Sequence, residues 1–260
     1  LLNNNDAADS SDEILTESEK DAIGEIANIS MGTAATTLFS LVNRRVEIST
    51  PVVSFSNWDK IVDEYEKPCV FIKIGYTQGL NGSNILVLKE KDVKIITDLM
   101  MGGDGTNING EIGELHLSAI SEAMNQMMGS SATSLSSMLN RTIDISPPIA
   151  EVVDLKNTLN EGEIDSFLSE EFVKISFHME IGDLVDSEIM QLYPPAFVKE
   201  MCKGVSQNME LDTQSVTEDV PQSSNTATQA APIQQPQDSG SMNNASANSQ
   251  GMINENMMNS

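Results

Sequence analysis

A glutamate and an asparagine three residues apart occur twice in this sequence, as Glu25 with Asn28 and as Glu122 with Asn125. A carboxylate can pair with a basic side chain of a partner. A carboxamide does not titrate, but it can accept one hydrogen bond and donate another, so it can orient a water molecule. Phosphoryl transfer depends mainly on an aligned nucleophile and on charge neutralisation. The two pairs are therefore candidates for hydrolysing a phosphate that another molecule carries.

The two pairs lie in a duplicated stretch. Segments 21–51 and 118–148 align without a gap at an offset of 97 residues, which indicates two structurally related halves. Residue types at solvated positions change easily between duplicated halves, yet the glutamate, the asparagine and a distant proline are identical in both. This identity favours a functional role over the plainer interpretation that polar residues merely occupy the wet side of a helix. The supporting positions of the motif are Asp21, Ser118, Pro51 and Pro148.

Helical spacing places each pair on one face. Asp21, Glu25 and Asn28 fall within roughly 60° of one another on an α-helix, and Ile23 and Ile26 lie opposite them. The second copy has the same arrangement. Each helix is therefore expected to bury an apolar stripe and to present a carboxylate and a carboxamide outward. The two prolines are expected to fix a turn or strand edge beside each helix.

The elements that must position these residues follow in the same order twice. The spacing of Thr16 and Glu19 is that of a capping box at the start of a long helix. Helices are predicted at about 16–43, 90–101, 113–140 and after Pro194-Pro195, and strands at about 46–55, 69–78, 83–89, 142–153, 171–181 and 185–193. The predicted fold class is α/β (α+β), with two pseudo-symmetric helix-plus-three-strand halves whose long helices pack on an antiparallel-rich sheet.

Composition divides the chain into three parts. These are a polar N-terminal segment expected to be disordered (1–14), a folded domain (15–204, halves about 15–104 and 111–204) and a polar tail without Lys or Arg, also expected to be disordered (205–260). A flexible connector is expected at 101–110 and an irregular acidic loop at 155–169. The start at Leu1-Leu2 and the linker-like tail favour a fragment of a longer protein.

Charge and cysteine usage narrow the function classes. The 39 acidic residues against 14 basic ones disfavour binding to nucleic acid or anionic lipid and favour partners that present Lys or Arg. No apolar run is long enough to cross a bilayer, so membrane insertion is not expected. Cys69 and Cys202 are far apart, which favours reduced thiols in the cytoplasm.

Other candidate motifs fail on spacing. The glycine-rich stretch 101–110 lacks the Gly-Lys-Ser/Thr of a phosphate-binding loop and the acidic ligands of a calcium loop. His116 and His178 have no neighbouring ligands at zinc spacing. We therefore predict no metal site and no tightly bound cofactor.

The pattern Asp/Ser-x3-Glu-x2-Asn-x22-Pro, present twice, resembles the CheC/CheX/FliY phosphatases of bacterial chemotaxis. The resemblance covers about residues 15–203. Two intact copies and a long polar linker resemble the FliY branch, which acts at the flagellar motor switch and continues into a FliN-like part that this chain lacks.

This resemblance implies hydrolysis of the aspartyl phosphate of CheY, a magnesium-binding response regulator. Glu25 and Glu122 would contact the active-site lysine of CheY, and Asn28 and Asn125 would hold the attacking water. It also implies a cytoplasmic location, peripheral at the basal body, and contacts with flagellar switch proteins through regions absent from this chain. The alternatives are a non-catalytic scaffold that binds phosphorylated CheY and a CheC-like regulator that works with a receptor deamidase.

Overall fold

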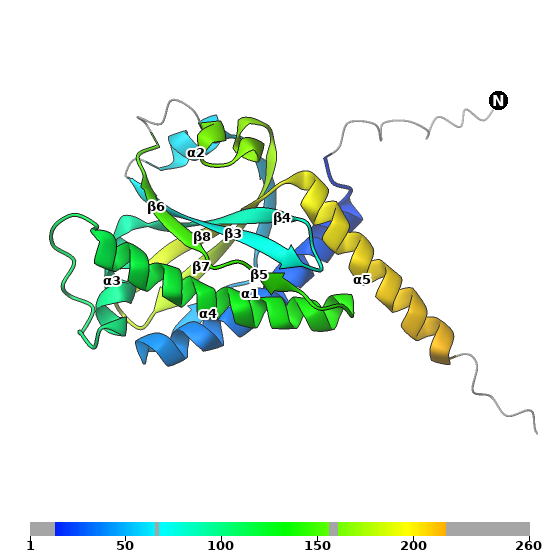
Figure 1. The fold of residues 1–260 in the computed structure, drawn as a ribbon, viewed down its shortest axis with the longest axis horizontal. Coiled ribbons are helices and arrows are strands. Elements are labelled where there is room, and N and C mark those ends of the chain that lie inside the picture. Colours follow the sequence, from blue (N-terminus) through cyan, green and yellow to red (C-terminus); the bar gives the residue numbers. More distant parts are fainter. Residues whose placement is uncertain (1–13, 66–67, 156–160, 217–260) are drawn as a thin grey trace, which may run out of the picture. The chain divides into compact units, whose positions relative to one another are not determined.

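The computed structural model describes residues 14–65, 68–155 and 161–216 (Figure 1). The first half contains α1 (Glu17–Val42), β1 (Val46–Ile48), β2 (Val52–Ser56), α2 (Trp58–Glu64), β3 (Cys69–Gln78), β4 (Gly82–Lys89) and α3 (Glu90–Met100). The second half contains α4 (Glu114–Leu139), β5 (Asp144–Ile145), β6 (Ile149–Val153), the 3-10 turns Glu161–Glu163 and Ser166–Ser169, β7 (Phe172–Ile181), β8 (Val185–Tyr193) and α5 (Pro195–Val216). The predicted succession of helices and strands in two halves is confirmed.

The strands form one sheet in which the two halves exchange their edges. The order is β1–β7–β8–β4–β3–β5, with β2 also paired to β7 and β6 also paired to β3, and each of these pairings is antiparallel. The hairpins meet at the centre, where Leu86 lies opposite Gln191. Neither half therefore completes its own sheet, because its first strands lie on the hairpin of the other half.

The long helices cover one face of this sheet. Alternate residues of β3 illustrate the two faces: Val70 and Ile72 belong to the main core with α1, α3, α4 and α5, whereas Cys69 and Phe71 pack with Trp58 of α2 in a second cluster. Period-2 alternation places successive strand side chains on opposite faces. The predicted packing of long helices on an antiparallel sheet is confirmed.

Both long helices begin and end close to the predicted positions. Thr16 Oγ1 accepts a hydrogen bond from Glu19 N at 3.2 Å, and Thr16 N donates to Glu19 Oε2 at 2.9 Å, which completes the expected capping box. Asn43 and Asn140 end the two helices with left-handed φ angles of 50° and 47°. Asparagine tolerates this conformation better than most residues.

The structure corrects several predicted boundaries. The single strand expected at 46–55 is divided into β1 and β2, and the one expected at 142–153 is divided into β5 and β6. Helix α2 was not predicted, because its seven residues are too few to give a clear helical period. It is capped by Asn57, whose Oδ1 accepts a hydrogen bond from Lys60 N at 3.1 Å. Helix α5 continues to Val216, so the expected start of the tail at residue 205 lies inside a helix.

The connector between the halves is anchored. The N–H of the buried Gly105 donates to Asp98 Oδ2 at 2.8 Å, and Lys94 Nζ donates to the carbonyl oxygen of Gly110. Two buried charged side chains of α3 thus contact the middle and the end of this segment, and its predicted flexibility stays a prediction. The disorder expected for 1–13 and 217–260 lies outside the described residues. Within the described ranges, no helix is long and apolar enough to span a bilayer.

Candidate functional site

The first Glu–Asn pair lies on the solvent face of α1. Asp21, Glu25 and Asn28 are exposed, whereas Ile23 and Ile26 are buried in the main core. The apolar stripe predicted from helical spacing therefore faces the sheet. We call this face, with Asp21, Glu25 and Asn28, site 1.

The second pair has the same orientation on α4. Ser118 and Glu122 are exposed and Asn125 is half-buried. The opposite face of α4 is buried through Ile120, Ala123, Met124 and Met127. We call the face with Ser118, Glu122 and Asn125 site 2. Both sites are thus accessible to a macromolecular partner.

The two sites lie at opposite ends of a helix pair. The hydroxyl groups of Thr33 and Ser134 share a hydrogen bond of 2.8 Å, and Thr37 Oγ1 donates to Ser130 Oγ at 2.8 Å. As the number of the first partner rises, that of the second falls, so α1 and α4 are antiparallel (Figure 1).

The offset of 97 makes these two hydrogen bonds equivalent under a pseudo-two-fold axis near Ala35 and Ala132. Asn28 and Asn125 each lie seven residues before that point. At about 1.5 Å of rise per residue, the two carboxamides are separated by roughly 20 Å along the helices. The sites are therefore separate, and they do not form one composite centre.

Pro51 and Pro148 lie at equivalent breaks in the edge strands. Pro51 separates β1 from β2, and Pro148 separates β5 from β6. Strand β2 then passes beside site 1, where a β-carbon added to Gly24 would lie 3.7 Å from Val53 Cγ2. The prolines lie where an edge strand is interrupted, because proline cannot donate to a strand ladder. Their predicted place at a strand edge agrees with the structure, and their role remains a prediction.

The carboxamides of both sites are available to a ligand. Within the described part of the chain, the side chains of Asn28 and Asn125 make no hydrogen bond. Glu122 Oε1 accepts from Gln126 Nε2 at 2.7 Å, whereas the position equivalent to Gln126 in site 1 is Ile29. Each amide can therefore accept from a water and donate to an anionic oxygen at the same time.

Neither histidine belongs to a metal site in the described residues, where no group of three His, Cys, Asp or Glu side chains could hold an ion. His116 Nδ1 accepts from Gly113 N at 3.2 Å at the start of α4. His178 Nε2 lies 3.0 Å from Glu180 Oε1 on the solvent side of β7. Both histidines thus have local structural contacts.

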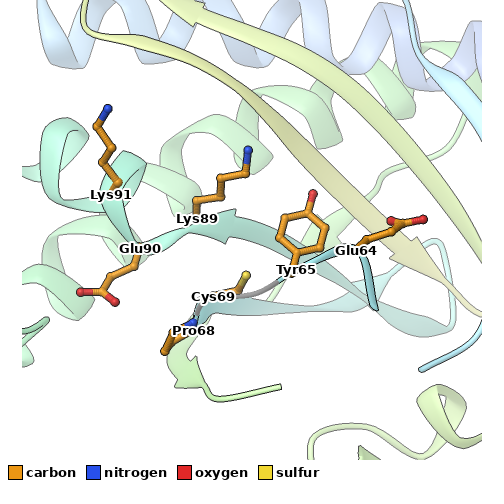
Figure 2. Close-up of a pocket in the computed structure, with 7 residues that line it drawn as sticks. All are labelled: Glu64, Tyr65, Pro68, Cys69, Lys89, Glu90 and Lys91. Carbon is orange, nitrogen blue, oxygen red and sulfur yellow. The ribbon is translucent and has the colours of Figure 1, made fainter. Parts of the chain in front are cut away.

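A cavity of about 300 Å³ opens elsewhere, between the end of α2 and the start of α3 (Figure 2). Tyr65, Cys69 and Lys89 line it, and Cys69 belongs to the cluster on the sheet face opposite α1 and α4. Burial raises the pKa of the Cys69 thiol to about 11, and that of Cys202 likewise to about 11. Neither thiol is activated as a nucleophile, since the thiolate is the reactive form.

Two residues beside site 1 were missed by the sequence interpretation. Ile29 and Phe39 are large apolar side chains of α1 with exposed fractions of 42% and 48%. Their equivalents in the second half are Gln126 and Ser136. The signal that identifies them in the sequence is the polarity difference between the aligned halves.

Comparison with known proteins matches both segments. The CheC-like family matches residues 19–55 and 115–152, which include both Glu–Asn pairs and both prolines. The chain is 48% identical over 191 residues to the flagellar motor switch phosphatase FliY of Bacillus subtilis, covering 74% of this chain and 50% of that protein. It is 24% identical over 143 residues to the CheY-P phosphatase CheC of Bacillus subtilis, covering 53% of this chain and 67% of that one.

A solved structure agrees with the sequence matches. The crystal structure of Thermotoga maritima FliY superposes with a TM-score of 0.68 at 42% identity, covering 75% of this chain and 99% of that one. This chain spans half the length of the Bacillus subtilis FliY it matches. The fold is thus shared with the Thermotoga maritima FliY structure, and the two segments that match the CheC-like family contain the two sites of this chain.

Proposed function

The chain belongs to the CheC-like family, and from this membership we propose that it is a phosphatase that hydrolyses the aspartyl phosphate of the response regulator CheY. The relatives support this proposal through their names, a flagellar motor switch phosphatase and a CheY-P phosphatase. By the same reasoning the reaction takes place at the flagellar motor switch, on the cytoplasmic side of the basal body. Loss of the phosphate there ends the chemotaxis signal.

The observation that carries the proposal is the repeated Glu–Asn pair on two exposed helix faces. The buried stripe of each helix fixes the backbone beneath the pair, so the Cα atom of each asparagine is held in place before a substrate arrives. Asn28 and Asn125 are reachable from solvent, and their amides have no internal hydrogen bond in the described residues. The backbone of each asparagine is thus preorganised, and only the side-chain torsions are ordered when the substrate binds.

In the proposed mechanism the asparagine enters beside the aspartyl phosphate of the receiver. Its Oδ1 accepts a hydrogen bond from the attacking water, and its Nδ2 donates to a phosphoryl oxygen. The water oxygen bonds to phosphorus, the bond between phosphorus and the aspartyl oxygen breaks, and a water proton leaves with the phosphate. Asparagine takes no proton. Being neutral, it can approach a dianion that would repel a carboxylate.

The glutamate of each site has a separate role in recognition. Glu25 and Glu122 would pair with the active-site lysine of the receiver, a charge-assisted contact that sets the orientation of docking. Magnesium belongs to the receiver as part of the substrate and neutralises phosphoryl charge. No residue of this chain needs to bind it, in keeping with the expectation that the chain binds no cofactor tightly.

The test compares hydrolysis of phosphorylated CheY by the wild-type chain, Asn28→Ala, Asn125→Ala and the double variant. Loss of one preorganised group is expected to slow the reaction at its own site by about 10²–10³. The double variant should approach the decay rate of CheY alone. Asn109→Ala, an exposed asparagine of the connector, is the matched control and should keep the wild-type rate.

Two outcomes would contradict the phosphatase proposal. If the double variant kept the wild-type rate, neither site would be catalytic. If the wild-type chain bound phosphorylated CheY without accelerating its decay, the chain would be the non-catalytic scaffold.

A further inference from the structure

The two sites share their polar residues but differ in what lies next to them. Ile29 follows Asn28 and Phe39 lies three turns further along the same side of α1, with about half of each side chain exposed. The equivalent residues of α4, Gln126 and Ser136, are polar. Single exposed apolar residues are common on protein surfaces, so these two carry an argument only together with the groove beside Phe39.

Phe39 forms one wall of a groove between α1 and β1. The groove has a volume of about 500 Å³ and is lined by Gly32, Thr36, Phe39, Val46 and Ile48 among others. Gly32 is four residues after Asn28, so the groove begins one helical turn from the carboxamide. A β-carbon added to Gly32 would meet no atom within 4 Å, so this end of the groove is open.

The second half uses the equivalent position differently. Ser136 Oγ donates to the carbonyl oxygen of Ala132 at 2.8 Å and accepts from Ile143 N at 2.9 Å. These bonds tie the chain before β5 directly to α4. Phenylalanine cannot make these bonds, so in the first half the equivalent position provides an apolar wall, and β1 is held by its pairing with β7.

We propose that this groove, together with Ile29, is an auxiliary docking surface for the same phosphorylated receiver that presents its phosphate to Asn28. The proposal rests on the proposed function. The occupant follows from continuity: a receiver whose phosphate reaches Asn28 must lay neighbouring surface over the next helical turn, where the groove begins. An apolar side chain beside the phosphorylated aspartate of the receiver fills it.

At site 2 the exposed apolar neighbour is a different one, Leu115, which is 65% exposed and lies three residues before Ser118 on α4. The groove contacts the receiver away from the reacting atoms, and its contribution is the same in the ground state and the transition state. Such uniform binding lowers KM without changing kcat. The groove therefore lowers the KM of site 1 for the phosphorylated receiver.

The test isolates site 1 in an Asn125→Ala background and gives it the residues of site 2, as Ile29→Gln with Phe39→Ser. The KM for phosphorylated CheY is expected to rise about tenfold at unchanged kcat, from the loss of two partly buried apolar contacts. Val152→Thr is the matched control, because Val152 is 43% exposed on β6 at the other edge of the sheet. An unchanged KM, or the same rise in the control, would overturn the proposal.

A binding measurement separates this proposal from the catalytic one. CheY held in its active form by beryllium trifluoride is titrated against the Asn28→Ala/Asn125→Ala chain with and without the two groove substitutions. Weaker binding with the substitutions supports the groove, even if the hydrolysis proposal has failed. Equal binding overturns the groove proposal. The proposal is also overturned if sedimentation shows that the substitutions dissociate a dimer and leave CheY binding intact, because the groove would then hold a second copy of this chain.

Discussion

The helices α1 and α4 carry the same pair of functional side chains in different surroundings. Glu122 is hydrogen-bonded to Gln126, whereas Glu25 has Ile29 at that position, and Asn125 is less exposed than Asn28. After the duplication, the residues proposed to act on phosphate stayed identical while their neighbours changed. The comparison shows two identical pairs of polar side chains in different surroundings, so the proposed roles of the pairs and of their neighbours can be tested separately.

The helices are also supported differently. A side-chain capping box starts α1 at Thr16, whereas α4 starts at Gly113, whose N–H donates to His116. Near its end, α4 is tied to the following strand by Ser136, and α1 has Phe39 there. The two helices thus begin with different hydrogen bonds, and Phe39 of α1 stands where Ser136 of α4 bonds to the following segment.

The largest expected effect on stability comes from removing the hydrogen bond between Ser136 and Ile143 in the second half. Ser136→Ala removes the acceptor for Ile143 N and should lower the free energy of unfolding by about 2 kcal/mol, because a partly buried N–H loses its partner. Chemical denaturation measures the change. Ser137→Ala is the control, since that exposed serine bonds only within its own helix. Equal losses in both variants would contradict a special role for Ser136.

A smaller effect is expected where the halves meet. Thr33→Ala and Thr37→Ala each remove one interhelical hydrogen bond and should each lower the free energy of unfolding by about 1 kcal/mol relative to Thr36→Ala. Thr36 is a matched control because its hydroxyl bonds only to Gly32 within α1. The axis relates the two hydrogen bonds, so similar losses are expected, and a loss in only one variant would show that the two bonds do not contribute equally.

The smallest expected effect concerns the two glutamates. Gln126→Ala, measured in an Asn28→Ala background, removes the hydrogen bond to Glu122 and should raise the kcat/KM of site 2 about threefold. The gain is small because an exposed hydrogen bond from Gln126 competes only weakly with the lysine of the receiver for the Glu122 carboxylate. The gain should shrink at high salt, which screens the lysine contact. A fall in kcat/KM would show instead that Gln126 helps site 2 by positioning Glu122.

Much of the fold could be predicted because its signals are local. Strand β3 is placed at the predicted residues 69–78, and α1 ends at the predicted Asn43, since alternation and an asparagine cap depend only on neighbouring residues. The orientation of Glu25 and Asn28 was predictable for the same reason, because a helical period relates them to the buried isoleucines. Helix α2 and the breaks at Pro51 and Pro148 were missed, since short elements give weak periodic signals.

By itself the sequence determined that there are two related halves and that each presents a glutamate and an asparagine on one helix face. Only the tertiary structure decided that the halves exchange edge strands and that α1 and α4 run antiparallel, which separates the sites. It alone also opened a groove beside Asn28. The physical reason is that strand exchange, helix crossing and groove formation depend on contacts between residues far apart in the chain, which no local period encodes.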